Sequence, residues 1–193
     1  MPAPGDILLM NGGTLTSNIV ALGQSVGSGK WVRVSHIAIH LAAGNFIHAV
    51  GKIGVHLAPI TRVLDGAGVG WRVIRLRNLT DAEREKLYFA ATYFTEQRYQ
   101  FRLRSPVRID TSFCSELAVK IYRRAGIGIF EGRNPTSIWP ADFEKEAKLL
   151  KDWEDVTEEY RALLAGVATN PDQALETLAV GGLQGPARRA SGA

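Results

Sequence analysis

Two kinds of side chain in this sequence could carry out nucleophilic chemistry together: one thiol and a group of imidazoles. Cys114 is the only cysteine, and all four histidines lie upstream of it. In thiol catalysis an imidazole takes the thiol proton while the sulfur attacks a carbonyl carbon. We expect Cys114 in the first turn of a helix, where unpaired backbone N–H groups favour a thiolate and can bind an oxyanion. The histidines are His36, His40, His48 and His56.

Short apolar and alternating segments upstream of Cys114 predict the sheet that positions these imidazoles. Within residues 33–42, positions 37, 39 and 41 are apolar and face one side, whereas His36 and His40 face the other. Gly44 and Asn45 fit the turn of a hairpin. We therefore expect an antiparallel meander of four or five strands. The predicted strands are residues 5–10, 33–42, 46–50, 54–60 and 71–76.

A helix that carries Cys114 is predicted over residues 113–125. Apolar residues recur along it at helical spacing. Three polar residues just before it could act as N-caps, and Gly126 lies where a C-cap glycine belongs. The N-cap candidates are Asp110, Thr111 and Ser112.

Two more helices flank this one in the sequence. Thr80 and Glu83 fit a capping box at the start of the first. The other covers residues 141–150, with a continuation toward Leu164. From residue 166 the chain is rich in Ala, Gly, Pro and Gln, so we predict one domain over residues 1–165 and a poorly packed tail over 166–193. Residues 11–30 are expected to form a loop with a brief helical turn.

The composition is that of a globular domain, with 46% hydrophobic and 22% charged residues among 193. A single cysteine excludes an intrachain disulfide. No apolar run reaches the roughly 18 residues of a membrane span, and no secretory signal is recognisable, so we expect a cytoplasmic protein, with signal-independent export left open. The net charge of +4 comes without a phosphate loop or zinc-finger spacing, so no specific nucleic-acid partner is expected.

Four stretches of the sequence resemble one family. GDILLMNGG, SHIAIHL, NFIHAVGKIGVHLAPI and FCSELAVKIYRRAGI, followed by WPADF, are similar to the YiiX-like branch of circularly permuted NlpC-type papain-like cysteine hydrolases, over about residues 5–145. The resemblance implies an α+β fold, a permuted papain-like fold in which a barrel-like antiparallel meander packs against the helix that carries the cysteine nucleophile.

The resemblance also implies roles for individual residues. Cys114 matches the nucleophile and His36 the general base. His48 stands at the third position, where many permuted members have a glutamate, and would orient the imidazole of His36. His40 is expected to line the cleft. Glu116 belongs to the helix motif and is expected to be structural, because positions i and i+2 of a helix point apart.

The implied reaction is acyl transfer without a cofactor, on a peptide or wall-peptide amide or on an ester. An acyl-lipid hydrolase or acyltransferase of the same fold is the alternative within the enzyme class. Outside it, His36, His40 and His48 could form a three-histidine zinc site of a non-catalytic metal-binding or interaction module, and an inactive member of the family is a further alternative. His56 could equally be a surface residue. The oligomeric state is left open.

Overall fold

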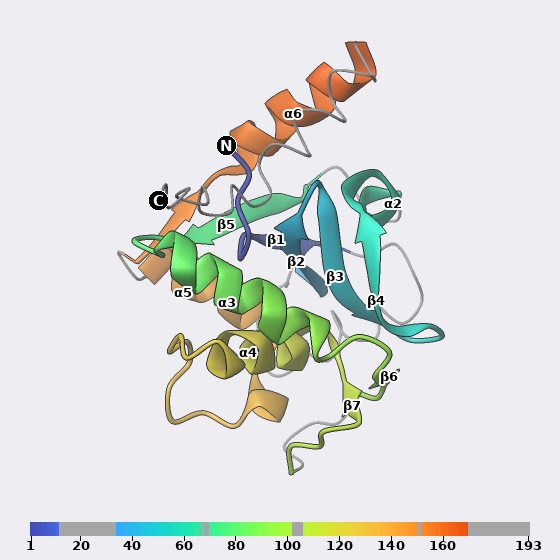
Figure 1. Cartoon of the computed structure of the whole chain (residues 1–193), viewed down its shortest axis with the longest axis vertical. Helices are drawn as coiled ribbons and strands as arrows, with labels where there is room; N and C mark the ends of the chain where they lie inside the picture. Colours follow the sequence, from blue (N-terminus) through green and yellow to red (C-terminus); the bar gives the residue numbers. More distant parts are fainter. Residues whose placement is uncertain (12–33, 66, 68–69, 102–105, 150–151, 170–193) are drawn as a thin grey trace, which may run out of the picture.

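The protein is built around one six-stranded antiparallel sheet (Figure 1). A computed structural model describes residues 1–11, 34–65, 67, 70–101, 106–149 and 152–169. The strand order is β4-β3-β2-β1-β5-β8. The strands are β1 (Ile7–Met10), β2 (His36–Ala42), β3 (Asn45–Val50), β4 (Gly54–Pro59), β5 (Arg72–Leu76) and β8 (Trp153–Asp155).

Helices cover both faces of this sheet. Figure 1 shows α3 and α4 together on one side of the sheet, with α6 and α2 on the other. Two short strands, β6 (Arg98–Tyr99) and β7 (Thr111–Ser112), pair in parallel just before α4. The helices are α2 (Ile60–Leu64), α3 (Asp81–Thr92), α4 (Cys114–Arg124), α5 (Pro140–Leu149) and α6 (Thr157–Thr169), with a 3₁₀ turn at Pro135–Ser137.

The side chains of β2 alternate between two separate apolar clusters. Ile37 and Ile39 belong to the larger cluster, together with Leu117 and other residues of α4. Ala38 belongs to the smaller cluster, on the face that packs against Tyr160 of α6. This alternation confirms the period-two pattern of the sequence, which is typical of a strand with helices on both faces.

The antiparallel α+β character is confirmed, but the strand order differs from a simple meander. β1 pairs with both β2 and β5, so it lies between segments that are distant in the sequence. The predicted continuation of the third helix is wrong. α5 ends at Leu149, Trp153 opens β8 beside Leu76, and α6 begins separately at Thr157. Trp153 is buried in the core, and this packing favours a strand over a longer helix.

The ends of the described chain bear on two further expectations. α6 extends to Thr169, past the predicted domain boundary at residue 165. The predicted loop at residues 11–30 lies outside the described residues except for Asn11, and so does the predicted tail from residue 170 onward.

The helix ends follow the sequence signals in two of three cases. Thr80 and Glu83 form the predicted capping box of α3. α4 ends as predicted, because Gly126 has φ +79° and the N–H of Ile127 donates to the carbonyl of Tyr122 at 3.0 Å. The predicted N-caps of α4 are wrong. Phe113 is the N-cap, because Thr111 and Ser112 are drawn into β7.

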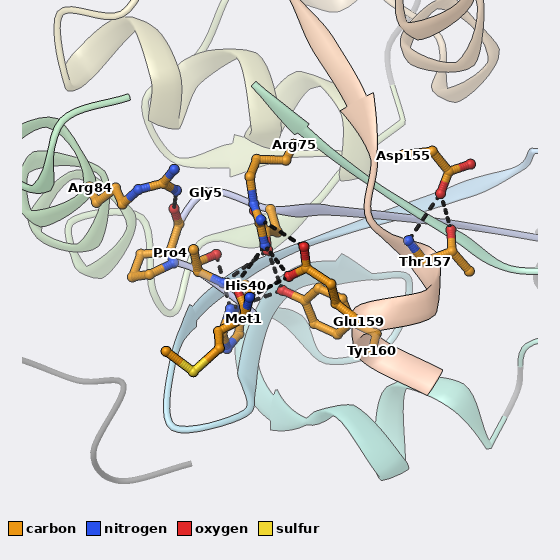
Figure 2. A network of polar contacts seen from close by, with 12 residues as sticks. Met1, Pro4, Gly5, His40, Arg75, Arg84, Asp155, Thr157, Glu159 and Tyr160 are labelled. Carbon is orange, nitrogen blue, oxygen red and sulfur yellow. Dashed lines mark hydrogen bonds and ion pairs between the residues drawn. The ribbon is translucent and has the colours of Figure 1, made fainter. Parts of the chain in front are cut away.

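A buried polar network joins the start of β1 to β5 and α6 (Figure 2). The carboxylate of Asp6 is fully buried and accepts two hydrogen bonds from Arg75, both at 2.7 Å. The hydroxyl of Tyr160 donates to the same carboxylate at 2.7 Å. Asp6 holds the pKa of the Arg75 guanidinium above its usual range, so the guanidinium stays charged. The network therefore fixes α6 against the sheet.

Within the described residues, no helix is both long enough and apolar enough to cross a membrane.

Candidate active site

Cys114 is the first residue of α4, and its neighbours hold the start of this helix firmly. Ser115 donates to the carbonyl of Ile138 at 2.6 Å. The carboxylate of Glu116 accepts from the N–H of Phe113 at 3.4 Å and forms a buried ion pair with Lys120 at 2.8 Å. A paired carboxylate at this position satisfies a backbone donor and complements the helix dipole. The structural role predicted for Glu116 is therefore confirmed.

The sulfur of Cys114 lies where α4 meets strand β2. The side chain is 6% exposed, and burial raises the pKa of the thiol to about 11. Backbone N–H groups of Ile37, Ser115 and Cys114 itself act in the opposite direction, because they stabilise a thiolate. Burial outweighs them, so the sulfur is held as a thiol at neutral pH.

Three of the four histidines form a continuous hydrogen-bonded chain across β2, β3 and β4. Nε2 of His36 lies 3.1 Å from Nδ1 of His48, and Nε2 of His48 lies 3.1 Å from Nε2 of His56. Nδ1 of His56 ends the chain at the carbonyl oxygen of Gly54, 3.3 Å away. The β3–β4 register places His48 directly opposite His56, which explains why their rings meet.

The imidazoles of His36 and His48 are neutral at physiological pH. Burial lowers the pKa of His36 to about 4, and a charge on His56 would lower it further by repulsion. Burial lowers the pKa of His48 to about 3, with added repulsion from His36 and His56. The site therefore holds a neutral imidazole and a neutral thiol, in place of the thiolate expected at the start of the helix, because burial disfavours both charged forms.

His36 contacts His48 directly, whereas Cys114 approaches Ile37, the residue that follows His36. The N–H of Ile37, which follows His36 in β2, interacts with the sulfur of Cys114. Among the described residues no hydrogen bond links His36 to Cys114, and Nδ1 of His36 has no hydrogen-bond partner. Of the predicted site residues, His36 and His48 are thus in contact, and the sulfur of Cys114, at the start of α4, meets the backbone of Ile37, the residue after His36.

His40 lies apart from this chain, although it shares a strand with His36. Its Nδ1 is 3.0 Å from the carbonyl of Ala3 and 3.1 Å from the hydroxyl of Tyr160. Its ring packs against Phe46. His40 is buried in the polar network of Figure 2, away from the other imidazoles, and so does not line a cleft as predicted.

Three residues near the site had no role predicted from the sequence. His56 completes the imidazole chain, and a hairpin centred on residue 52 would have placed it opposite His48. Burial raises the pKa of the Tyr99 phenol. Tyr99 also lies close enough to Cys114 that a negative charge on the sulfur would raise this pKa further. Gln97 contacts both β4 and the segment before α4 through its backbone and side chain. Neither Tyr99 nor Gln97 lies in a segment with a recognisable pattern.

The alternative of a three-histidine zinc site does not fit this arrangement. His40 points into a different cluster, and the two ring nitrogens of His48 each face a different imidazole, so no three donors converge. Among the described residues, no group of three or more His, Cys, Asp or Glu side chains could hold a metal ion.

Comparisons with known proteins show the fold of this chain. No protein-family model matches it, and no curated protein matches it in sequence. A solved structure that does match is that of the metalloprotein yiiX from Escherichia coli O157:H7, DUF1105, with a TM-score of 0.54. The match has 22% sequence identity and covers 81% of this chain and 88% of that chain. The chain therefore shares its α+β fold with yiiX.

Proposed function

We propose that this protein is a thiol-dependent acyl hydrolase with a permuted papain-like arrangement, in which Cys114 is the nucleophile and His36 the general base. The observation that carries the proposal is the position of the sulfur. It lies at the N-terminus of α4 and interacts with the N–H of Ile37, the residue that follows His36 in β2. Nε2 of His36 is held by His48, and its Nδ1 has no partner among the described residues. A nucleophile, a base and a residue that orients the base are the parts this chemistry requires.

Because both groups start neutral, proton transfer accompanies attack. As the bond between sulfur and carbonyl carbon forms, the thiol proton moves to Nδ1 of His36. The backbone N–H groups at the start of α4 stabilise the oxyanion. His36 then returns this proton to the leaving amine or alcohol as its bond to the carbonyl carbon breaks. Water hydrolyses the resulting thioester, which releases a carboxylic acid and regenerates the thiol.

Peptides, including bacterial wall peptides, are the first substrate class for this reaction. The resemblance of the segments around His36 and Cys114 to NlpC-type hydrolases supports amide cleavage. Incubation of the protein with a mixture of wall peptides, followed by mass spectrometry, would show a cleaved amide bond and identify its position.

An acyl lipid is the second candidate substrate, and one surface favours it. A hollow of about 450 Å³ lies beside the segment that precedes α4, with Val107, Ile109, Arg123 and Arg124 in its wall. Val107 and Ile109 are exposed. Apolar side chains next to cations suit an acyl chain with an anionic headgroup. Release of fatty acid from phosphatidylglycerol vesicles, without cleavage of wall peptides, would select this class.

The test of the proposed chemistry uses p-nitrophenyl acetate, an activated ester that acetylates the nucleophilic thiol of such hydrolases. We expect a burst of p-nitrophenol and an acetylated protein whose modified residue is Cys114. Cys114→Ser and His36→Gln should abolish the burst while the far-UV circular dichroism spectrum is unchanged. His40→Gln is the matched control, because it removes a histidine of the same strand that lies outside the imidazole chain. Full activity of the Cys114→Ser protein would contradict the proposal.

A further inference from the structure

The hydrogen bonds among the three imidazoles have a direction that their outer end determines. A carbonyl oxygen only accepts, so the contact of Nδ1 of His56 with the Gly54 carbonyl requires that neutral His56 carry its proton on Nδ1. Nε2 of His56 then bears a lone pair. It accepts from the Nε2–H of His48, 3.1 Å away.

The same constraint passes inward to His36. With its proton on Nε2, neutral His48 can only accept at Nδ1, so the contact at 3.1 Å is a donation from the Nε2–H of His36. Neutral His36 therefore has its lone pair on Nδ1. This is the nitrogen that takes the thiol proton in the proposed reaction, and it is the one that is free of partners among the described residues.

The anchor of the chain is held by close packing of the backbone. Gly54 has φ +91°, and a side chain at this position would collide with the backbone oxygen of Gln97. The same oxygen accepts from the N–H of Val55 at 2.7 Å. The Gly54 carbonyl is thus positioned by a segment that also packs near the start of α4, and a residue with a side chain would displace it.

Two observations indicate that the chain of three imidazoles selects the tautomer of His36. Burial keeps His36 and His48 neutral, so each ring has one proton and each contact has a defined donor. The described residues place no carboxylate against either ring, as their hydrogen bonds are to one another and to His56. A carboxylate is the usual group that holds a catalytic imidazole in one tautomer. Here the oriented chain is the alternative.

We infer that His56 is a positioning residue, which acts through His48 to hold His36 in the tautomer whose Nδ1 lone pair is available to the Cys114 thiol. The inference rests on the proposed thiol-hydrolase function. It assigns His48 and His56 together to the place that a single carboxylate or amide occupies in other thiol hydrolases.

Two substitutions with opposite hydrogen-bonding character test this role. His56→Glu offers only acceptors to His48 and preserves the direction of the chain, whereas His56→Lys offers only donors and reverses it. With p-nitrophenyl acetate as the probe, we expect H56E to retain most of the wild-type kcat. H56K should lose about 100-fold or more in kcat with a smaller change in KM, because the base is in the wrong tautomer. Equal losses in the two variants would indicate a merely structural role and overturn the inference.

Long-range ¹H–¹⁵N correlation spectra of the imidazole rings report the tautomers without any turnover. The four histidines can be assigned with one His→Gln variant each. In the wild type we expect the proton on Nδ1 of His56 and on Nε2 of His36; in H56K we expect it on Nδ1 of His36. A wild-type His56 protonated on Nε2 would overturn the inference even if the variants do not fold. If the spectra agree but Cys114→Ser still hydrolyses the ester, the tautomer assignment is supported and the thiol-hydrolase function is overturned.

Discussion

The hydroxyl of Ser112 donates a hydrogen bond to the side-chain oxygen of Gln97 at 2.8 Å, two residues before Cys114. Gln97 also accepts the N–H of Val55 on its backbone oxygen, and its side-chain amide donates to the carbonyl of Ile109. This one residue therefore contacts the strand that carries His56 and the segment that leads into α4. The nucleophile half and the imidazole half of the site are joined through it.

Removal of the Gln97 side chain should weaken this junction. We expect Gln97→Ala to lower the free energy of unfolding by about 1–3 kcal/mol, because the Ser112 hydroxyl and the Ile109 carbonyl lose buried partners. The initial rate of Cys114 acylation by p-nitrophenyl acetate should also fall. Urea denaturation measures the first effect. Gln100→Ala is the matched control in the same segment, and an equal loss there would contradict the role of Gln97.

The reactivity of Cys114 should reflect its neutral resting state. Because burial raises the pKa of the thiol to about 11, the rate of alkylation by iodoacetamide should rise about tenfold per pH unit between pH 7 and 9. The same protein unfolded in urea is the control, and its thiol should react faster at pH 8 because an exposed cysteine has a pKa of about 8.5. A rate that is already at its plateau at pH 7 would show a preformed thiolate and contradict this prediction.

Acid should destabilise the fold through the buried imidazoles. The pKa of His48 is about 3 in the folded protein, whereas an exposed histidine has a pKa of about 6.5. Between these values the unfolded chain binds a proton that the folded protein does not. The free energy of unfolding should therefore fall as the pH is lowered from 7 to 4, by at most about 1.4 kcal/mol per pH unit for this residue. Urea titrations at several pH values measure this slope, which should be shallower in His48→Gln; an unchanged slope would contradict the assignment.

The polar network around Asp6 should contribute to stability independently of the site. Tyr160→Phe removes a hydroxyl that donates to a fully buried carboxylate, so we expect the free energy of unfolding to fall by about 1–3 kcal/mol. Tyr88→Phe is the control, since its ring packs at the edge of the core. Thermal denaturation of both variants at pH 7 makes the comparison. A loss of the same size in Tyr88→Phe would indicate a general effect of tyrosine removal.

Local patterns in the sequence predicted the elements that depend on neighbouring residues. The alternation around Ile37 identified β2 and the sides of its residues, and Thr80 and Gly126 marked helix ends correctly. Contacts between distant segments were not predictable in this way. The three-residue strand β8 exists because Trp153 is buried beside Leu76, and nothing within its own sequence distinguishes it from a turn.

The candidate site shows the same division. The sequence was enough to select Cys114, His36 and His48 as candidates and to predict that Cys114 begins a helix. The protonation of these groups could not, because it depends on how much water the folded protein excludes around each one. The contact of His48 with His56 required the β3–β4 register, and the role of Gly54 required the close approach of Gln97.

The central place of β1 has a consequence for how the chain acquires its structure. The β2–β3–β4 segment can pair through short-range hairpins, whereas in the described sheet β5 is joined to this segment by pairing with β1. Early hairpin formation followed by late insertion of β1 is the order that loop-closure entropy favours. Amide hydrogens of β1 should accordingly exchange with solvent only through complete unfolding, while those at the edge strand β4 exchange through smaller openings. The imidazole chain would thus be assembled before the two halves of the sheet are joined.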